Sequence, residues 1–453
     1  MNENSRINKI ASSPSWLEAI RAYFKPKILA MMALGFASGL PFMMYFSKLS
    51  RWLTDAGVEK ATIGFFYWIG LAYALKFVWA PVVDRFRLPI LTSWLGQRRS
   101  WMFFAILGTI LGMGIISLAQ PDPAVSGSLT LLVIGAFVLT YSGATLDISV
   151  DAWRIESGSN EEQANLAAVY QLGYRFAIMA AGYAMVFADL ASWNWTYRLT
   201  AVIMMFVLIA VLFVKEPVPD TRNKITHGIA DSFNQYVVSP FQTFFTRFGL
   251  WVLPVLSLVC LYRLSDFTMG VMTQPLYADL GFTKTTVGLI TGTFGPWPLI
   301  AGAFISGVFC VKFGLMRTLL IGAIITIITN GAFWWLAGQT DTSALKLTLV
   351  IVADNIAAGF VGTVFIAYMS SLVDRRYAAT QYALLSSGYA LICKIIAGFS
   401  GVIYDSLGPP NFFLLTAAYG IPAILLILFI WKFAPAPARG IQPKDTSLAE
   451  TES

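Results

Sequence analysis

Histidine, cysteine and charged side chains are all scarce in this chain of 453 residues. The sequence holds one histidine and three cysteines, and 12% of its residues are charged, against about 25% in a typical soluble domain. The cysteines show no CxxC spacing and His227 stands alone, so neither a disulfide framework nor a metal site is expected. The absence of a GxxxxGK[ST] segment argues against ATP-driven transport. Because no nucleophile–base set appears either, we expect neither an enzyme nor a bound cofactor, and any proton carried in the membrane must use a carboxylate.

Apolar residues are abundant instead, at 57% of the chain. A membrane-crossing helix needs about 20 predominantly apolar residues, and twelve stretches meet that requirement. They are 28–47, 62–83, 101–119, 129–150, 164–189, 196–214, 250–276, 286–311, 318–337, 347–373, 380–403 and 411–432. Backbone groups in hydrocarbon must be hydrogen-bonded internally, so stretches of this length predict helices. The sequence therefore predicts an all-α membrane protein that crosses the lipid bilayer many times.

Lysine and arginine are distributed unevenly between the predicted loops. If both termini lie in the cytoplasm, the inner segments hold 21 of these residues and the outer loops hold 6. Cytoplasmic loops are enriched in lysine and arginine, so this bias favours cytoplasmic termini. The net charge of +7 then reflects membrane orientation, and we expect no nucleic-acid partner.

The chain divides into two halves of six spans each. The expected parts are a cytoplasmic N-tail, an N-terminal six-helix bundle, a cytoplasmic central loop, a C-terminal six-helix bundle and a cytoplasmic C-tail, at 1–27, 28–214, 215–249, 250–432 and 433–453. Aromatic residues recur at near-helical spacing from Phe233 to Phe248, which predicts a helix on the inner membrane surface. A hydrophobic linker packed against the bundle is the alternative.

The two halves carry related loops. Asp84-Arg85 ends the second span and is followed, after an insertion, by Gly96-Gln97-Arg98-Arg99. In the second half, the stretch from Gly307 to Arg317 has Val311 where the first copy has its acid. Both resemble the G-x-x-x-D-[RK]-x-G-x-x-R loop of the major facilitator superfamily. Paired halves of this kind suit a transporter whose site lies at the interface between repeats.

Longer motifs make the resemblance more specific, and the chain is similar to the AmpG-like muropeptide permeases of that superfamily. The matching stretches are Leu34 to Pro41, Lys76 to Arg85, Asp147 to Arg154, Leu172 to Arg175, Tyr262 to Asp266, Asp354-Asn355, Gly362 to Leu372 and Ala379 to Leu384. The chain departs from the family pattern at Thr145-Leu146, where a Gln often precedes the Asp, and at Pro296 and Pro298. It also lacks the two extra spans of some members.

The resemblance implies a fold, a cargo and an energy source. The fold is that of the major facilitator superfamily, with 12 transmembrane helices in two pseudo-symmetric six-helix bundles and with spans 1, 4, 7 and 10 around a central cavity. The implied function is proton-driven import of anhydromuropeptides, the disaccharide–peptide fragments released in cell-wall recycling, across the bacterial inner membrane. We expect a monomer whose partners are this substrate, protons and lipid.

Seven charged residues lie in the predicted spans away from the span ends, where a charge costs roughly 2.5–3.5 kcal/mol on insertion scales. They are Lys76, Asp147, Arg175, Arg263, Asp266, Asp354 and Lys394. None falls on spans 3, 6, 9 or 12, the outer scaffold of the family fold, so we expect them to face inward. Three bases and two acids remain when Lys76 and Asp147 are set aside, which predicts a cavity of net positive charge.

These charges are expected to divide into structural and working groups. Lys76 and Asp147 lie at similar depth on spans 2 and 4, so they are expected to pair. Four further charges, Asp84, Arg85, Asp151 and Arg154, lie at the cytoplasmic rim and are interpreted as gate charges, with solvated helix ends as the alternative.

Asp354 and Asp266 are the candidate proton-coupling residues, and the alternative for both is structural pairing. Asp266 shares a helix face with Arg263, three residues away. Arg175, Arg263 and Lys394 are expected to attract carboxylates of the peptide moiety, because a guanidinium matches a carboxylate bidentately. Three amide side chains are candidate hydrogen-bonding partners for sugar hydroxyls: Gln171, Gln274 and Gln381.

Two other functions stay open from the sequence. An importer of siderophores or other small peptide-like molecules would use the same scaffold. A membrane sensor that transports nothing is a second alternative, which the buried charges disfavour.

Overall fold

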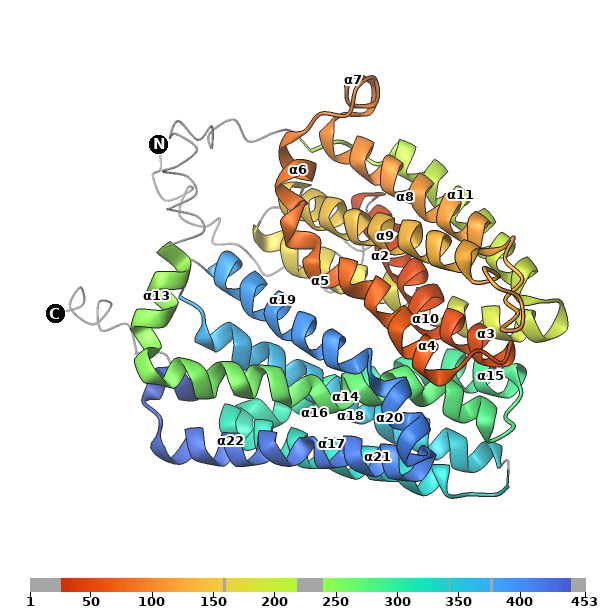
Figure 1. Cartoon of the computed structure of the whole chain (residues 1–453). Helices are drawn as coiled ribbons and strands as arrows, with labels where there is room; N and C mark the ends of the chain where they lie inside the picture. The colour runs from red at the N-terminus through yellow and green to blue at the C-terminus, as the bar shows by residue number, and fades with distance from the viewer. Residues whose placement is uncertain (1–25, 158–159, 218–238, 342, 375–377, 441–453) are drawn as a thin grey trace, which may run out of the picture.

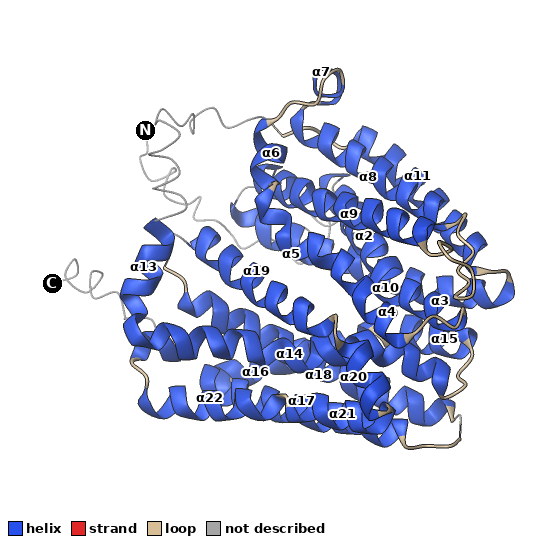
Figure 2. Cartoon of the chain, viewed as in Figure 1, coloured by secondary structure: helices blue, strands red, loops and turns tan. Residues whose placement is uncertain are grey.

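The computed structural model describes residues 26–157, 160–217, 239–341, 343–374 and 378–440. These residues form helices joined by loops and turns, and no strand occurs among them (Figure 2). The predicted all-α architecture is confirmed for this part of the chain. Most of the central loop and of both tails, including His227 and Phe233, lies outside the described residues.

The first half of the chain forms the N-terminal bundle. Its α-helices are α2 (Pro26–Met43), α3 (Ser50–Asp55), α4 (Lys60–Phe66), α5 (Ala72–Leu75), α6 (Ala80–Arg85), α7 (Leu91–Leu95), α8 (Gln97–Ile116), α9 (Thr130–Ser157), α10 (Asn160–Leu190) and α11 (Trp193–Phe213). A π-helical segment, Met44–Leu49, joins α2 to α3, and 3₁₀ segments at Tyr67–Leu71 and Lys76–Val78 interrupt the second span.

The second half forms the C-terminal bundle. Its α-helices are α13 (Ser239–Phe248), α14 (Val252–Asp279), α15 (Lys284–Phe294), α16 (Pro296–Phe313), α17 (Leu315–Ala337), α18 (Ala344–Leu372), α19 (Ala378–Ala397), α20 (Ser400–Leu407), α21 (Pro409–Ala418) and α22 (Gly420–Phe433). Pro296 begins α16 at a helix break, as expected of a residue that has no backbone N–H to continue α15.

Eleven helical segments of the described chain are long and apolar enough to cross a membrane, and each overlaps one of the twelve predicted spans. The remaining prediction, 164–189, falls on the 31-residue helix α10. Its Arg175 and Asp189 lower its mean hydropathy, but α10 packs against α2 and α15 among the other membrane helices.

The two bundles meet at one end of the molecule and diverge toward the other (Figure 1). We name the end at which they meet the outer end; it holds the loops at 56–59 and 280–283. The inner end holds α6, α7 and α13. At the outer end α10 packs on α15, α4 on α20 and α3 on α14, so every one of these contacts joins one bundle to the other.

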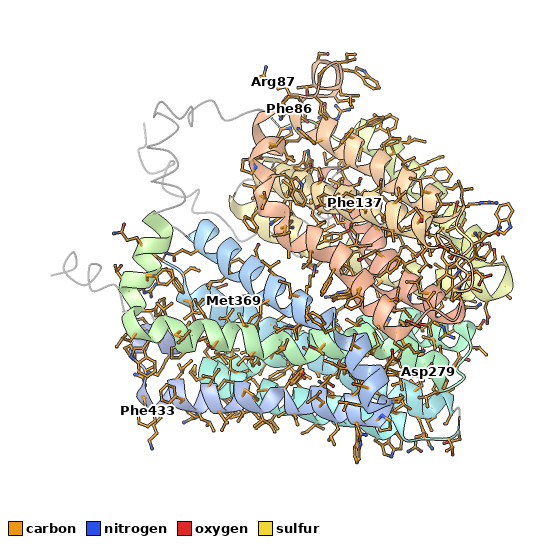
Figure 3. All side chains as sticks on the ribbon, viewed as in Figure 1. Phe86, Arg87, Phe137, Asp279, Met369 and Phe433 are labelled. Atoms are coloured by element: carbon orange, nitrogen blue, oxygen red, sulfur yellow. The ribbon has the colours of Figure 1, made fainter. Side chains whose placement is uncertain are left out.

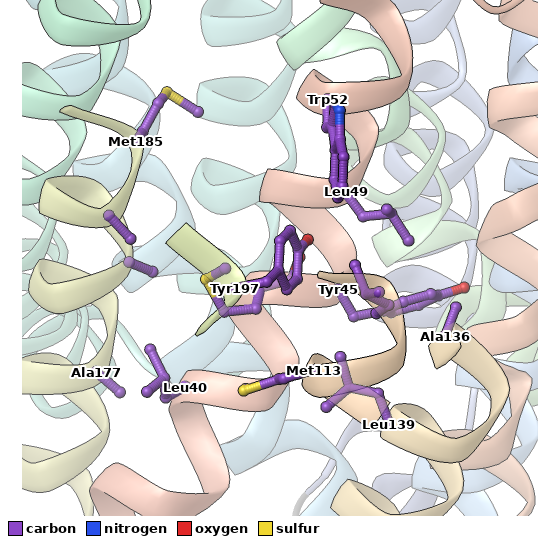
Figure 4. Close-up of a cluster of buried hydrophobic side chains, with 14 of the residues drawn as sticks. Leu40, Tyr45, Leu49, Trp52, Met113, Ala136, Leu139, Ala177, Met185 and Tyr197 are labelled. Carbon is purple, nitrogen blue, oxygen red and sulfur yellow. The ribbon is translucent and has the colours of Figure 1, made fainter. Parts of the chain in front are cut away.

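The apolar core follows the same division. One buried cluster is continuous across the outer end, from Trp52 and Tyr197 of the N-terminal bundle to Tyr277 and Phe333 of the C-terminal bundle. Figure 4 shows the part of this cluster around Leu40, Tyr45 and Tyr197. A second cluster, which includes Val255 and Phe365, belongs to the C-terminal bundle alone.

The predicted surface helix corresponds in part to α13 at the inner end (Figure 1). Phe244 and Phe248 are both 3% exposed and pack into the second core cluster, whereas Phe245 is exposed. Arg247 donates a hydrogen bond to the carbonyl of Leu372 at 3.2 Å. The described part of the segment therefore combines an amphipathic helix with packing against the bundle.

Candidate functional site

A polar cavity of about 240 Å³ opens inside the C-terminal bundle between α14, α15 and α18. We call it the C-bundle cavity. Its polar and charged lining consists of Arg263, Asp266, Thr273, Gln274, Tyr277, Thr291, Asp354 and Asn355. Both predicted coupling acids thus line one cavity, although they lie 88 positions apart in sequence.

The charges of this cavity are unevenly paired. Arg263 donates a hydrogen bond to Asp266 at 2.7 Å, and the two side chains are 21% and 22% exposed. No lysine or arginine among the described residues lies within ion-pair distance of Asp354. The cavity therefore holds one base and two acids. Arg175 and Lys394, the other two bases of the predicted working set, do not line it, so the predicted net positive charge does not apply to this cavity.

Gln274 is 6% exposed, and its Oε1 has no hydrogen-bond partner in the described structure. A buried acceptor without a partner costs about 1–3 kcal/mol. The side chain lines the cavity, so its orphan oxygen is available to a donor that enters there.

Lys76 and Asp147 lie within ion-pair distance, as their depth on spans 2 and 4 predicts. Nζ of Lys76 is 3.7 Å from Oδ2 of Asp147, and the side chains are 33% and 20% exposed. Lys76 begins the 3₁₀ segment that breaks the second span, which the sequence did not reveal.

Lys394 lies at the junction of the two bundles, away from the C-bundle cavity. It is 5% exposed on α19 and donates a hydrogen bond to the carbonyl of Gly70 at 2.9 Å. Its ammonium also lies 4.9 Å from the ring centre of Phe46 and 5.6 Å from that of Tyr73. These contacts lie across the bundle interface, so this lysine joins the two bundles at mid-depth.

Arg175 and Gln171 lie on the face of α10 that approaches the other bundle. Arg175 precedes Gly182 by seven residues and follows Gln171 by four, so the three residues share one helix face. Gly182 packs directly on Gly292 of α15. Arg175 makes no ion pair with the described residues, and Gln171 is exposed. Both therefore continue the bundle interface toward the inner end, where the bundles diverge.

Gln381 does not reach the C-bundle cavity. It is 1% exposed, and its Oε1 accepts a hydrogen bond from the backbone N–H of Asp374 at 2.7 Å. The side chain thus ties α19 to Asp374, just after the end of α18.

The inner charges pair within the N-terminal bundle. Arg98 donates to Asp84 at 2.6 Å and to Glu156 at 2.5 Å, while Arg154 lies 3.4 Å from Asp151. The side chain of Arg85 is outside the described set. Sequence reasoning named Asp84 but missed its pairing with Arg98 and the bond from Arg98 to Glu156, because these two residues come from the start of α8 and the end of α9.

A second set of charges, missed from the sequence, joins the bundles at the outer end. Lys60 of α4 donates to Asp279 of α14 at 2.8 Å, and Figure 3 shows Asp279 where the bundles meet. Lys284 of α15 lies 3.8 Å from Asp55 and 3.7 Å from Asp189. The lysines had been counted only as loop charges, and nothing in their spacing indicates the partners.

Comparisons with known proteins agree on the family. The model of the Major Facilitator Superfamily matches residues 31–393 and 255–450. The chain is 31% identical over 407 residues to a Rickettsia conorii protein named AmpG 4, and the alignment covers 89% of this chain and 96% of that protein. It is 30% identical over 412 residues to the anhydromuropeptide permease of Escherichia coli (strain K12), and that alignment covers 90% of this chain and 80% of the permease. The chain belongs to the AmpG-like branch of the major facilitator superfamily.

Solved structures confirm the major facilitator fold. The D-xylose–proton symporter superimposes with a TM-score of 0.67 at 14% identity, covering 93% of this chain and 100% of that one. The inward open xylose transporter of E. coli superimposes with a TM-score of 0.62 at 13% identity, covering 94% of this chain and 98% of that one. Members of the major facilitator superfamily are membrane transporters, so this chain is a multi-pass membrane transporter and the resemblance read from its motifs is confirmed.

Proposed function

We propose that this transporter imports anhydromuropeptides across the bacterial cytoplasmic membrane, coupled to the entry of protons. The name of the E. coli relative supports the cargo. The observation that carries the proposal is the C-bundle cavity, in which Asp354 lies beside the Arg263–Asp266 pair and has no cation partner among the described residues.

The charge count of this cavity suits proton coupling. With both acids ionised, one base leaves a net charge of −1, and a single proton on Asp354 or Asp266 makes the cavity neutral. An uncompensated charge inside a membrane protein is costly. Proton binding therefore lowers the cost of moving the loaded site through an occluded state, which is how a proton gradient can drive transport.

The substrate would lie between the two bundles. Arg175 faces this region from α10 with Gln171 one turn away, and a guanidinium binds peptide carboxylates bidentately. On the opposite side Gln274 and Asn355 offer amide groups to sugar hydroxyls and N-acetyl groups. We leave Lys394 and Gln381 out of the proposed site, because both are buried and already hydrogen-bonded.

The structure corresponds, in the predicted orientation, to the state open toward the cytoplasm. The ion pairs Lys60–Asp279 and Lys284–Asp55 hold the outer end together. Alternating access then requires these pairs to break while the inner ends of the bundles approach each other.

The test is uptake of purified, radiolabelled anhydromuropeptide into proteoliposomes with an imposed pH gradient, acidic outside. We expect accumulation above the external concentration, and its loss when a protonophore collapses the gradient. An iron–siderophore complex, offered in parallel, should not accumulate. Uptake of that complex without uptake of the muropeptide would show that the cargo is a siderophore. Uptake of neither would favour the alternative of a membrane sensor that transports nothing.

A further inference from the structure

The polar side chains of the C-bundle cavity offer it mainly oxygen lone pairs. Thr273 and Thr291 donate their hydroxyl protons to backbone carbonyls one turn earlier on their own helices, at 3.0 Å and 2.8 Å. Asn355 donates an amide N–H to a carbonyl of its own helix at 2.7 Å. Because these donors are used within the helices, what the three side chains present to the cavity is chiefly acceptor oxygen.

Gln274 gives an independent sign that a ligand belongs in this cavity. The side chain is 6% exposed and lines the cavity, and its Oε1 has no hydrogen-bond partner in the described structure. The space beside it is open, because a Cβ added to Gly270, one turn earlier on α14, would meet nothing within 4 Å. Buried polar atoms nearly always have a partner in the protein or in ordered water, so this oxygen calls for a group that enters the cavity.

The charge of the cavity decides what that group is. Arg263 is engaged by Asp266 at 2.7 Å, and Asp354 has no lysine or arginine within ion-pair distance in the described part of the chain. The titratable groups that face Asp354 in the cavity are Arg263, Asp266 and Tyr277, all from α14, while α15 contributes Thr291, which does not titrate. With both acids ionised the net charge is −1. A ligand with a single positive charge makes the cavity neutral, whereas a divalent ion leaves an excess of +1.

We propose that the C-bundle cavity binds one alkali-metal cation, Na⁺ or K⁺, between Asp354, Gln274 and Asn355. Hard cations take oxygen ligands from carboxylates and amide carbonyls, which are the groups present here. A water molecule needs roughly 10–15 Å³ of such a cavity, so a volume of about 240 Å³ holds the ion together with waters that complete its coordination. The scarcity of histidine and cysteine argues against a transition-metal site but not against this one, because an alkali cation uses neither.

The ion and the coupling proton compete for the same charge. A cation held by the ionised carboxylate keeps a proton off Asp354, and a proton on Asp354 removes the main ligand of the cation. After a proton leaves for the cytoplasm, a cytoplasmic cation therefore occupies the cavity and hinders the return of the proton. The ion site rests on the cavity alone, so its test requires no cargo and its outcome does not depend on which molecule the transporter imports.

Thermal unfolding of the purified protein without substrate tests the site. NaCl and KCl are titrated at alkaline pH, and choline chloride keeps the ionic strength constant. A ligand that binds the folded state alone stabilises it, so the melting temperature should rise with Na⁺ or K⁺ and then saturate. The ion with the lower half-saturating concentration is the ligand. No rise beyond that in choline chloride, or a stronger effect of CaCl₂ at equal ionic strength, overturns the proposal.

Three variants locate the ion. Asp354→Asn should abolish the response, and Gln274→Leu, which keeps the charge of the cavity, should raise the half-saturating concentration several-fold. Asp341→Asn is the control, because its carboxylate is 59% exposed, pairs with Lys346 and does not line the cavity. It should respond as the parent protein does. A full response in both Asp354→Asn and Gln274→Leu overturns the proposal.

Competition with the proton gives a second measurement, which a purely structural carboxylate would not affect. Because the ion binds only the ionised acid, its half-saturating concentration should rise as the pH falls, by about tenfold per pH unit once Asp354 is mostly protonated. The Asp341→Asn control should show the same dependence. A half-saturating concentration that does not change with pH overturns the placement of the ion at Asp354.

Discussion

Gly182 of α10 lies directly against Gly292 of α15: a Cβ placed on Gly182 would come within 2.4 Å of the Cα of Gly292. The contact joins the two bundles, and it leaves no room for a side chain on Gly182. Helices approach this closely in membranes where small residues face each other. The closed outer end therefore depends on this pair as well as on its ion pairs.

Gly182→Ala should destabilise the closed outer end. The added methyl group would meet backbone atoms of Gly292 and Gly288, and overpacking of this kind costs typically 1–3 kcal/mol. We expect a membrane-impermeant thiol reagent, added from outside, to modify a cysteine at Thr273 several-fold faster than in the parent. Gly331→Ala on α17 is the control, because nothing lies within 4 Å of its added Cβ. Equal rates in the two variants would contradict this role of Gly182.

Asp279→Asn should open the outer end by a different route. Asp279 accepts hydrogen bonds from Lys60 at 2.8 Å and from Tyr404 at 2.9 Å. The pair with Lys60 is partly exposed, so its loss is worth roughly 1 kcal/mol or less. We expect a modest increase in the same Thr273 labelling rate, and an increase of similar size in the parent protein at high salt. If Asp279→Asn labels more slowly than the parent, the pair does not hold this end closed.

Asp354→Asn should uncouple transport from the pH gradient. The variant keeps the shape of the cavity but fixes its charge at neutral beside the Arg263–Asp266 pair. Accumulation against a concentration gradient should be lost, while exchange of labelled for unlabelled substrate continues. Asp266→Asn should also abolish accumulation, with a larger loss of stability because it leaves Arg263 without its 2.7 Å partner. If both variants concentrate substrate as the parent does, the coupling assignment is wrong.

Gln274→Leu and Gln381→Leu should have opposite effects on stability. Oε1 of Gln274 is buried without a partner, so leucine removes an unpaired group and the melting temperature should stay level or rise. Oε1 of Gln381 accepts from Asp374, so leucine there should cost about 1–3 kcal/mol. Substrate affinity should fall only in Gln274→Leu. Thermal unfolding and equilibrium binding distinguish the two, and a destabilised Gln274→Leu would contradict the orphan acceptor.

Ile90→Gly should stabilise the protein. Ile90 has φ = 66°, and the N–H of Leu91 donates a hydrogen bond to the carbonyl of Pro89 at 2.7 Å. The positive φ and this bond between residues two apart define a strained γ-turn centred on Ile90. A β-branched residue strongly disfavours positive φ, and glycine removes that penalty of about 1–2 kcal/mol. The side chain is 85% exposed, so little packing is lost. A lower melting temperature would show that Ile90 has a contact partner of its own, such as lipid.

The sequence predicted features that depend on one helix or on depth in the membrane. Span lengths, the pairing distance of Lys76 and Asp147, and the shared face of Arg263 and Asp266 all follow from regular helical geometry. Asp354 was placed on the correct span, and the structure adds that it shares a cavity with Asp266.

Features that depend on how the two bundles meet were not predicted. Lys394 reaches Gly70 because the second span loosens into a 3₁₀ turn there. Residues 67–78 contain no proline, and the single Gly70 does not by itself predict that turn. The outer ion pair of Lys60 and Asp279 brings residues 219 positions apart into contact in one conformational state. A pattern along one chain does not contain such distances, since they change when the transporter changes state.

The continuous apolar cluster at the outer end has a thermodynamic consequence. Opening that end exposes Trp52, Tyr277 and their neighbours to water or lipid at a cost proportional to the area uncovered. Within the described part of the chain, no apolar cluster joins the two bundles at the inner end, so separating them there costs less apolar burial. In the empty transporter, apolar packing therefore favours the state in which the outer end is closed. Substrate and protons need to supply free energy only for the step that opens this end.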